Sequence, residues 1–127
     1  LDKMFGKDNY IGRFFATKPN SKGFVHIDMA HSELNPRYWS LNFPVFNCQR
    51  NYHEWFSTNS EPDLISKEFN SWFWTTDNNV KLIDKLELTE PYILSVSVPH
   101  RINNPTNEVR VVFAVRTLNN EETFKFL

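Results

Sequence analysis

The sequence predicts an all-β fold, a jelly roll or barrel with little helix. Three features point to it: short alternating or apolar segments recur, turn-forming residues separate them, and no long stretch shows helical periodicity. Eight short strands with turns at this spacing are typical of a jelly roll or a barrel. At 127 residues, 40% of them hydrophobic, the chain is long enough to bury a core. We therefore expect residues 1–127 to form a single jelly-roll domain.

The expected strands follow one another in a regular order. They cover residues 10–17, 23–28, 38–46, 51–57, 69–76, 80–88, 92–99 and 108–117, with a further strand near 121–126. The segments between them are rich in Asn, Pro, Asp, Ser and Gly, which favour turns. Residues 60–71 are where we expect one or two helical turns, because Glu61-Pro62-Asp63 resembles a helix start.

The strand expected over 38–46 has two different faces. From Tyr38 to Phe43 the odd positions are apolar and the even positions are polar. Since alternate residues of a strand point to opposite sides, Tyr38, Ser40 and Asn42 share one face. Either this polar face lines a cavity, or it faces water while Leu41 and Phe43 fill the core.

The last two strands predict a hairpin around Pro105. If the turn centres on Pro105, His100 lies directly opposite Arg110, and Val98 lies opposite Val112. The even positions from 94 to 100 form an apolar row that ends in His100. The two side chains are then expected side by side at the mouth of an apolar interior. A register shift of one residue would separate them.

Charge and composition exclude several classes of partner. The formal net charge is −1 and the sequence pI is about 6.5, so nothing favours binding to nucleic acid or to an anionic membrane. No apolar run is long enough to span a bilayer. The single cysteine, Cys48, fits a reducing compartment, and no charged-then-apolar leader opens the chain. We expect a cytoplasmic protein; the sequence gives no oligomeric state.

Three residues have the spacing of a metal-binding triad. His26 and Asp28 are two residues apart on an expected strand, so both leave the same face. With His100 downstream, two imidazoles and one carboxylate would form the facial triad of non-haem Fe(II) oxygenases. Arg110, ten residues after His100, suggests a carboxylate-bearing cosubstrate beside that metal. Each of these residues taken alone is more often structural, so the hypothesis depends on their joint order, faces and spacing.

A family resemblance follows from these residues. His26-Ile27-Asp28, Leu41-Asn42-Phe43-Pro44-Val45, Val98-Pro99-His100 and Arg110 together resemble a small Fe(II)/2-oxoglutarate-dependent oxygenase, over about residues 13–117. The resemblance implies a double-stranded β-helix, which is a cupin-like jelly roll.

The resemblance also implies roles for five residues. His26, Asp28 and His100 would be the catalytic ligands of Fe(II), and Arg110 would hold the distal carboxylate of 2-oxoglutarate. Asn42 would contact the cosubstrate or the substrate. The implied activity is that of an oxidoreductase, a dioxygenase that hydroxylates a small molecule or a peptide.

Two other hypotheses stay open. The chain could be a non-catalytic cupin-like jelly-roll binding module, in which a metal is absent or incidental. It could also be a cupin-type metalloenzyme that keeps the metal and does not need Arg110.

The remaining histidines and a run of aromatic residues are expected to serve other purposes. We expect His31 in a loop as a surface or substrate-side residue, and His53 in a strand as a packing residue. The aromatic run Phe69, Trp72, Phe73 and Trp74 would stack sugars or bases if it were exposed, but we expect this cluster to be core.

Overall fold

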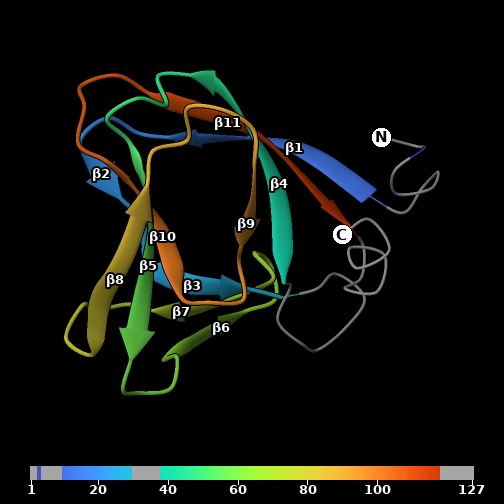
Figure 1. Ribbon diagram of the computed structural model, residues 1–127. Coiled ribbons are helices and arrows are strands. Elements are labelled where there is room, and N and C mark those ends of the chain that lie inside the picture. The colour runs from blue at the N-terminus through green and yellow to red at the C-terminus, as the bar shows by residue number, and fades with distance from the viewer. Residues whose placement is uncertain (1–2, 4–9, 30–37, 118–127) are drawn as a thin grey trace.

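The computed structural model describes residues 3, 10–29 and 38–117, and its secondary structure there is β-strand (Figure 1). The strands are β1 Tyr10–Thr17, β2 Ser21–Lys22, β3 Val25–Asp28, β4 Trp39–Phe46, β5 Tyr52–Thr58, β6 Leu64–Ser66, β7 Ser71–Trp74, β8 Val80–Leu86, β9 Tyr92–Ser95, β10 His100–Asn104 and β11 Arg110–Thr117. In this part of the chain no helix is long and apolar enough to cross a membrane.

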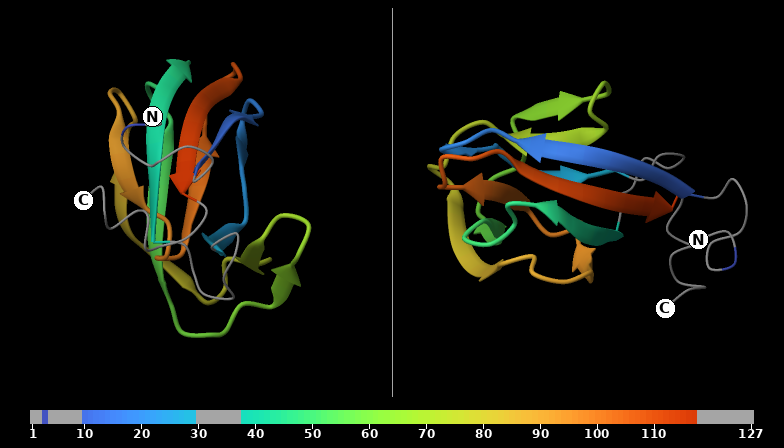
Figure 2. Two further views of the ribbon diagram at one scale, coloured as in Figure 1. Left: turned by 90° about the vertical axis from the view of Figure 1, so that its right-hand side faces the viewer. Right: turned by 90° about the horizontal axis from the view of Figure 1, so that it is seen from above.

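Two antiparallel sheets form the fold. One has the order β1-β11-β4-β9, and the other has the order β6-β7-β3-β10-β5-β8, with β2 paired to β10. Figures 1 and 2 show the sheets as two layers, with β6 and β7 extending from one end. The chain passes repeatedly between the layers, for example from β1 to β3 to β4 to β5. This topology is a double-stranded β-helix, a cupin-like jelly roll, which confirms the predicted fold class.

Strand β3 has hydrophobic core residues on one face and polar side chains on the other. Its odd positions, Val25 and Ile27, are buried and pack with Phe56 and Trp74. Its even positions, His26 and Asp28, therefore point to the opposite side, toward the space between the sheets. A register shift of one residue in β3 would remove Val25 and Ile27 from the core. The packing of this apolar pair therefore fixes the side to which His26 and Asp28 point.

The predicted hairpin around Pro105 is wrong. β10 pairs with β2, β3 and β5, whereas β11 pairs with β1 and β4. The partner of His100 is therefore His26 on one side and Trp55 on the other, and Arg110 pairs with Thr17. The turn carries the chain from one sheet to the other instead of folding it back.

The side chain of Asn104 explains why this corner is stable. It is fully buried, and its Nδ2 donates to the carbonyl oxygens of Thr17, Lys18 and Glu108 at 3.3, 3.1 and 2.8 Å. These bonds tie the end of β10 to the end of β1 and to the start of β11. Asn and Pro favour a turn of either kind, so turn chemistry alone does not distinguish a hairpin from a crossover.

The expected helical turns in residues 60–71 are also wrong, because β6 pairs with β7 there. Asp63 does not begin a helix; its carboxylate accepts hydrogen bonds from the backbone N and the hydroxyl of Thr75, at 3.1 and 3.0 Å. The indole of Trp74 donates to the Ser60 carbonyl at 3.0 Å. The strand expected over 92–99 ends at Ser95, and the one expected at 121–126 lies outside the described residues.

Candidate metal centre

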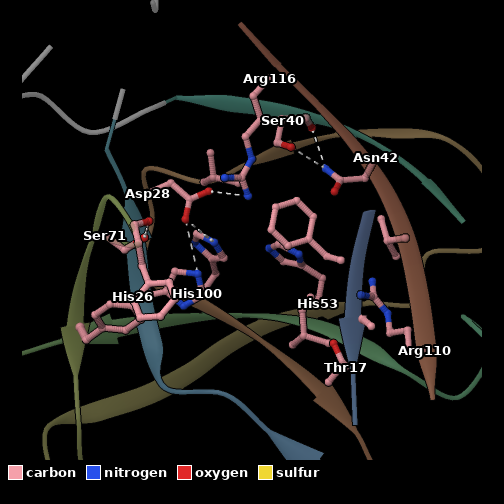
Figure 3. Close-up of a pocket in the computed structure, with 17 residues that line it drawn as sticks. Thr17, His26, Asp28, Ser40, Asn42, His53, Ser71, His100, Arg110 and Arg116 are labelled. Atoms are coloured by element: carbon pink, nitrogen blue, oxygen red, sulfur yellow. Dashed lines mark hydrogen bonds and ion pairs between the residues drawn. The ribbon is translucent and has the colours of Figure 1, made fainter. Parts of the chain in front are cut away.

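His26, Asp28 and His100 converge on one point between the sheets (Figure 3). β3 supplies His26 and Asp28, and β10 supplies His100, whose backbone is paired with His26. The Asp28 Oδ1 atom lies 3.4 Å from His26 Nε2 and 3.9 Å from His100 Nε2. One donor atom from each residue can be chosen so that all three lie within 4.8 Å of one another. In a metal site each donor atom lies about 2.0–2.2 Å from the ion, so the donor atoms lie a few ångström from one another. The three donors here are already close to such an arrangement, and small side-chain movements would suffice to bind a metal.

The two histidines already have the tautomer that a metal needs. The Nδ1 atom of His26 lies 2.9 Å from the carbonyl oxygen of Phe24, and that of His100 lies 2.8 Å from the carbonyl oxygen of Val98. Because a carbonyl only accepts hydrogen bonds, each Nδ1 carries the proton and donates it. With Nδ1 bonded to the backbone, the Nε2 atom of each ring faces the centre, and hydrogen bonds of this kind orient histidine ligands in metal sites.

The charge states also suit a cation. Burial by itself would raise the pKa of Asp28, but the guanidinium of Arg116, together with His26 and His100, lowers it well below its usual range. Arg116 Nη2 lies 3.0 Å from Asp28 Oδ2. Burial, and next the neighbouring His26, lower the pKa of His100 to about 4. At neutral pH the centre therefore presents a carboxylate and a neutral imidazole on His100.

The triad lies at one end of a cavity of about 300 Å³, and Arg110 lies at the other (Figure 3). Arg110 is 3% exposed, and burial lowers the pKa of its guanidinium, an effect that Cys48 partly opposes. Within the described residues it has no carboxylate partner, and its Nε atom has no hydrogen-bond partner. A buried cation without a counter-ion is costly, so this end of the cavity suits an anion.

The polar face of β4 contributes to the same cavity. Ser40, which is buried, and Asn42 both line it. The Asn42 Nδ2 atom donates to the carbonyl and the hydroxyl oxygens of Ser40 at 2.9 and 3.1 Å, which fixes the amide orientation. The first interpretation of this strand, in which the polar face lines a cavity, is confirmed for these two residues. A contact between Asn42 and a ligand stays a prediction.

Sequence reasoning did not assign His53 and Arg116 to the cavity. His53 packs across strands as expected, because it stacks on His100 with ring centroids 5.0 Å apart, but it also lines the cavity. Its Nε2 atom is buried without a partner. Arg116 could have been found from strand alternation, because it lies six residues after Arg110 and so on the same face. His31 lies outside the described residues.

The aromatic run divides between core and surface. Trp74 is buried, as expected. Phe69, in contrast, is 69% exposed, and with Phe73 it borders the cavity. The prediction that this cluster is core therefore holds for Trp74 and for Trp72, which packs half-buried against the same core cluster, and is wrong for Phe69.

Fold and site together define a cupin-like jelly-roll domain with a His–Asp–His group that could bind a metal ion. No family model matches the sequence, and no curated protein matches it. Among solved structures, the chain is similar to Peruvianin-I, described as a cysteine peptidase from Thevetia peruviana latex, with a TM-score of 0.47 and 14% identity over 88% of this chain and 53% of that one. It is also similar to RmlC from Streptococcus suis in complex with dTDP-D-xylose, with a TM-score of 0.45 and 7% identity over 92% of this chain and 48% of that one. The chain thus spans about half the length of these two proteins.

Proposed function

We propose that this protein is an Fe(II)/2-oxoglutarate-dependent oxygenase, a hydroxylase. The observation that carries the proposal is the buried guanidinium of Arg110, which has no carboxylate partner among the described residues and lies in the same cavity as the His–Asp–His group. 2-Oxoglutarate is a dianion that chelates a metal with one carboxylate and its keto oxygen, while its distal carboxylate needs a cation. A cavity with a possible metal-binding group at one end and, at the other, a buried guanidinium that no described carboxylate neutralises suits such a molecule.

The size of the cavity supports a small dicarboxylate. At about 300 Å³ it lies at the lower end of the roughly 300–1,000 Å³ typical of small-molecule sites. Arg110 can meet a carboxylate with two parallel charge-assisted hydrogen bonds, because its guanidinium is planar. Ser40, Asn42 and His53 supply further polar groups along the walls.

In the proposed reaction the residues of the chain bind and orient, and they exclude water. His26, Asp28 and His100 would hold Fe(II) on one face and leave the opposite positions open for exchangeable ligands. With Fe(II) bound, the centre supplies O₂ activation, so that 2-oxoglutarate, O₂ and a substrate C–H group give succinate, CO₂ and a hydroxylated product. Asp28 keeps its negative charge through Arg116, which also holds one of its two oxygens.

The test is an anaerobic titration of the Fe(II) protein with 2-oxoglutarate, followed by a succinate assay in air. We expect the visible charge-transfer band of a metal-chelated 2-oxo acid, followed by slow succinate release without substrate. Asp28→Ala should abolish both, while Asp84→Asn, at an exposed carboxylate on β8, should change neither. Melting curves close to the wild type would show that Asp28→Ala keeps the fold.

Each failure has a distinct meaning. Iron binding without any affinity for 2-oxoglutarate would contradict the proposal and favour a cupin-type metalloenzyme. An absence of metal binding would contradict it as well and favour a binding module.

A further inference from the structure

A second cavity adjoins the metal centre. It measures about 360 Å³ and lies between β1, β11 and the turn that joins β6 to β7. We call it the vestibule and define it by Arg13, Phe15, Lys67, Glu68, Phe69 and Arg116.

The vestibule adjoins the metal cavity, because Phe15, Phe69 and Arg116 line both. Arg116 is also the residue that pairs with Asp28, so a molecule in the vestibule lies next to the metal centre. Arg110 and Arg116 are at opposite ends of β11, and six residues of strand span about 20 Å. The vestibule is thus remote from the end of the cavity proposed for the distal carboxylate of 2-oxoglutarate.

Positive charge predominates in the vestibule. Among the described residues that line it, Arg13, Lys67 and Arg116 are cations and Glu68 is an acid, and Arg116 is already paired with Asp28. Arg13 and Lys67 are exposed, and neither forms an ion pair with any residue in the described ranges. The whole chain has a net charge of −1, so this local excess of cations does not follow from its composition. Cations gathered in a cleft attract and orient anionic ligands.

Apolar surface accompanies the charge. Phe15 is 38% exposed and Phe69 is 69% exposed. The guanidinium of Arg116 lies over the Phe15 ring, 4.8 Å from its centroid. Exposed aromatic faces beside free cations suit a ligand that joins an apolar stem to an anionic group.

We propose that the vestibule binds a carboxylate or phosphate group of the substrate through Arg13 and Lys67, with an apolar stem between Phe15 and Phe69. This inference rests on the proposed function, since it names the class of substrate that the metal centre would hydroxylate. The anionic group fixes one end of the substrate, and the stem leads toward the open side of the triad.

Three probes with one ring test the class of ligand: phenylacetate, phenylphosphate and phenethylamine. Their dissociation constants are measured by calorimetry on the Zn(II) protein saturated with 2-oxoglutarate, so that Arg110 is already occupied. We expect at least one of the two anions to bind, the amine not to bind, and anion binding to weaken as salt rises. The tighter of the two anions shows whether the group is a carboxylate or a phosphate.

Two substitutions locate the binding. Arg13→Gln and Lys67→Gln should each weaken anion binding about threefold and together about tenfold, as for exposed charges. Lys22→Gln and Arg50→Gln, at exposed cations outside the vestibule, should have no effect. None of the four should change the affinity for 2-oxoglutarate.

Equal binding of the amine, or an unchanged anion affinity in the Arg13→Gln, Lys67→Gln protein, would overturn the inference. A second measurement distinguishes failure of this inference from failure of the proposed function. The dissociation constants of the same probes are measured on Arg110→Met in the absence of 2-oxoglutarate. Anion binding that persists there and still depends on Arg13 and Lys67 supports the vestibule even if the protein never releases succinate.

Discussion

Two buried arginines close together in the sequence are held in opposite ways. Arg101 on β10 is 7% exposed, and its guanidinium pairs with Glu54 at 3.1 Å and with Asp77 at 3.0 Å. Arg110 on β11 is 3% exposed and has no carboxylate partner among the described residues. The first guanidinium is neutralised by the chain itself, and it also lies over the ring of Phe56.

This difference distinguishes a buried charge that the fold neutralises from one that the described residues leave without a counter-ion. Removing water from a cation is costly, and the cost is offset only if fixed anions replace the water. Around Arg101 the folded chain supplies those anions. Around Arg110 the described residues supply a cavity and no carboxylate, which leaves room for an anion from outside. Substitutions at the two positions should accordingly have opposite signatures.

The largest expected effect is on stability. Arg101→Met should reduce the free energy of unfolding by about 3–5 kcal/mol, because it leaves the buried Glu54 carboxylate without its partner. Arg110→Met should leave the ligand-free protein as stable as the wild type or make it more stable, since it removes an uncompensated charge. Urea unfolding of the two variants checks both expectations. Equal losses of stability would show that Arg110, too, is held by the chain.

The next effect is on the cosubstrate. Arg110→Lys should weaken 2-oxoglutarate binding by about 2–5 kcal/mol, or about 30-fold and more, because an ammonium cannot form two parallel bonds to a carboxylate. Calorimetry on the Zn(II) protein measures the dissociation constant, and Arg50→Lys at an exposed site serves as the control. An unchanged dissociation constant for Arg110→Lys would remove this residue from the site.

The contrast between the arginines also shows what the sequence could predict. The bounds of β1 and the shared face of His26 and Asp28 follow from alternation within one strand, and both agree with the structure. Whether an arginine is paired depends on strands far away in the chain, and local patterns carry no information on that. Arg101 meets Glu54 through the β10–β5 pairing, and this pairing cannot be inferred from alternation.

The same limit explains the errors in the fold. The turn at Pro105 has the residues of a hairpin, but the crossover depends on Asn104 reaching Thr17 and Lys18 at the other end of the sequence. The helix start expected at Asp63 failed because Thr75, twelve residues later, binds its carboxylate. His53 was assigned to packing because nothing in its own segment shows that β5 lies beside His100.

A smaller effect concerns pH at the triad end of the cavity. Burial and the neighbouring His26 lower the pKa of His100 to about 4, from an ordinary 6.5. Between these values the unfolded chain binds more protons than the folded one, so the stability of the metal-free protein rises with pH and is lost as pH falls from about 6.5 toward 4.

Between pH 7 and pH 5, His100 should account for a loss of stability on the order of 2 kcal/mol. Unfolding curves of the wild type and of His100→Phe at pH 7, 6 and 5 isolate it, and the variant should show the flatter dependence. A variant as pH-dependent as the wild type would assign the slope to other groups, of which His53, with its own lowered pKa, is the first candidate.

The smallest effect tests whether unpaired polar atoms in this cavity serve a ligand. His53 Nε2 is buried without a partner, like Arg110 Nε, and both residues line the cavity. His53→Phe keeps an aromatic ring against His100 but removes the nitrogen atom. Without ligand the variant should be at least as stable as the wild type, because an unsatisfied polar atom has been replaced by carbon.

If His53 Nε2 forms a hydrogen bond to 2-oxoglutarate, the affinity of the variant for 2-oxoglutarate should fall by about 1 kcal/mol, or about fivefold. If His53 served packing alone, the dissociation constant of 2-oxoglutarate would stay unchanged in His53→Phe.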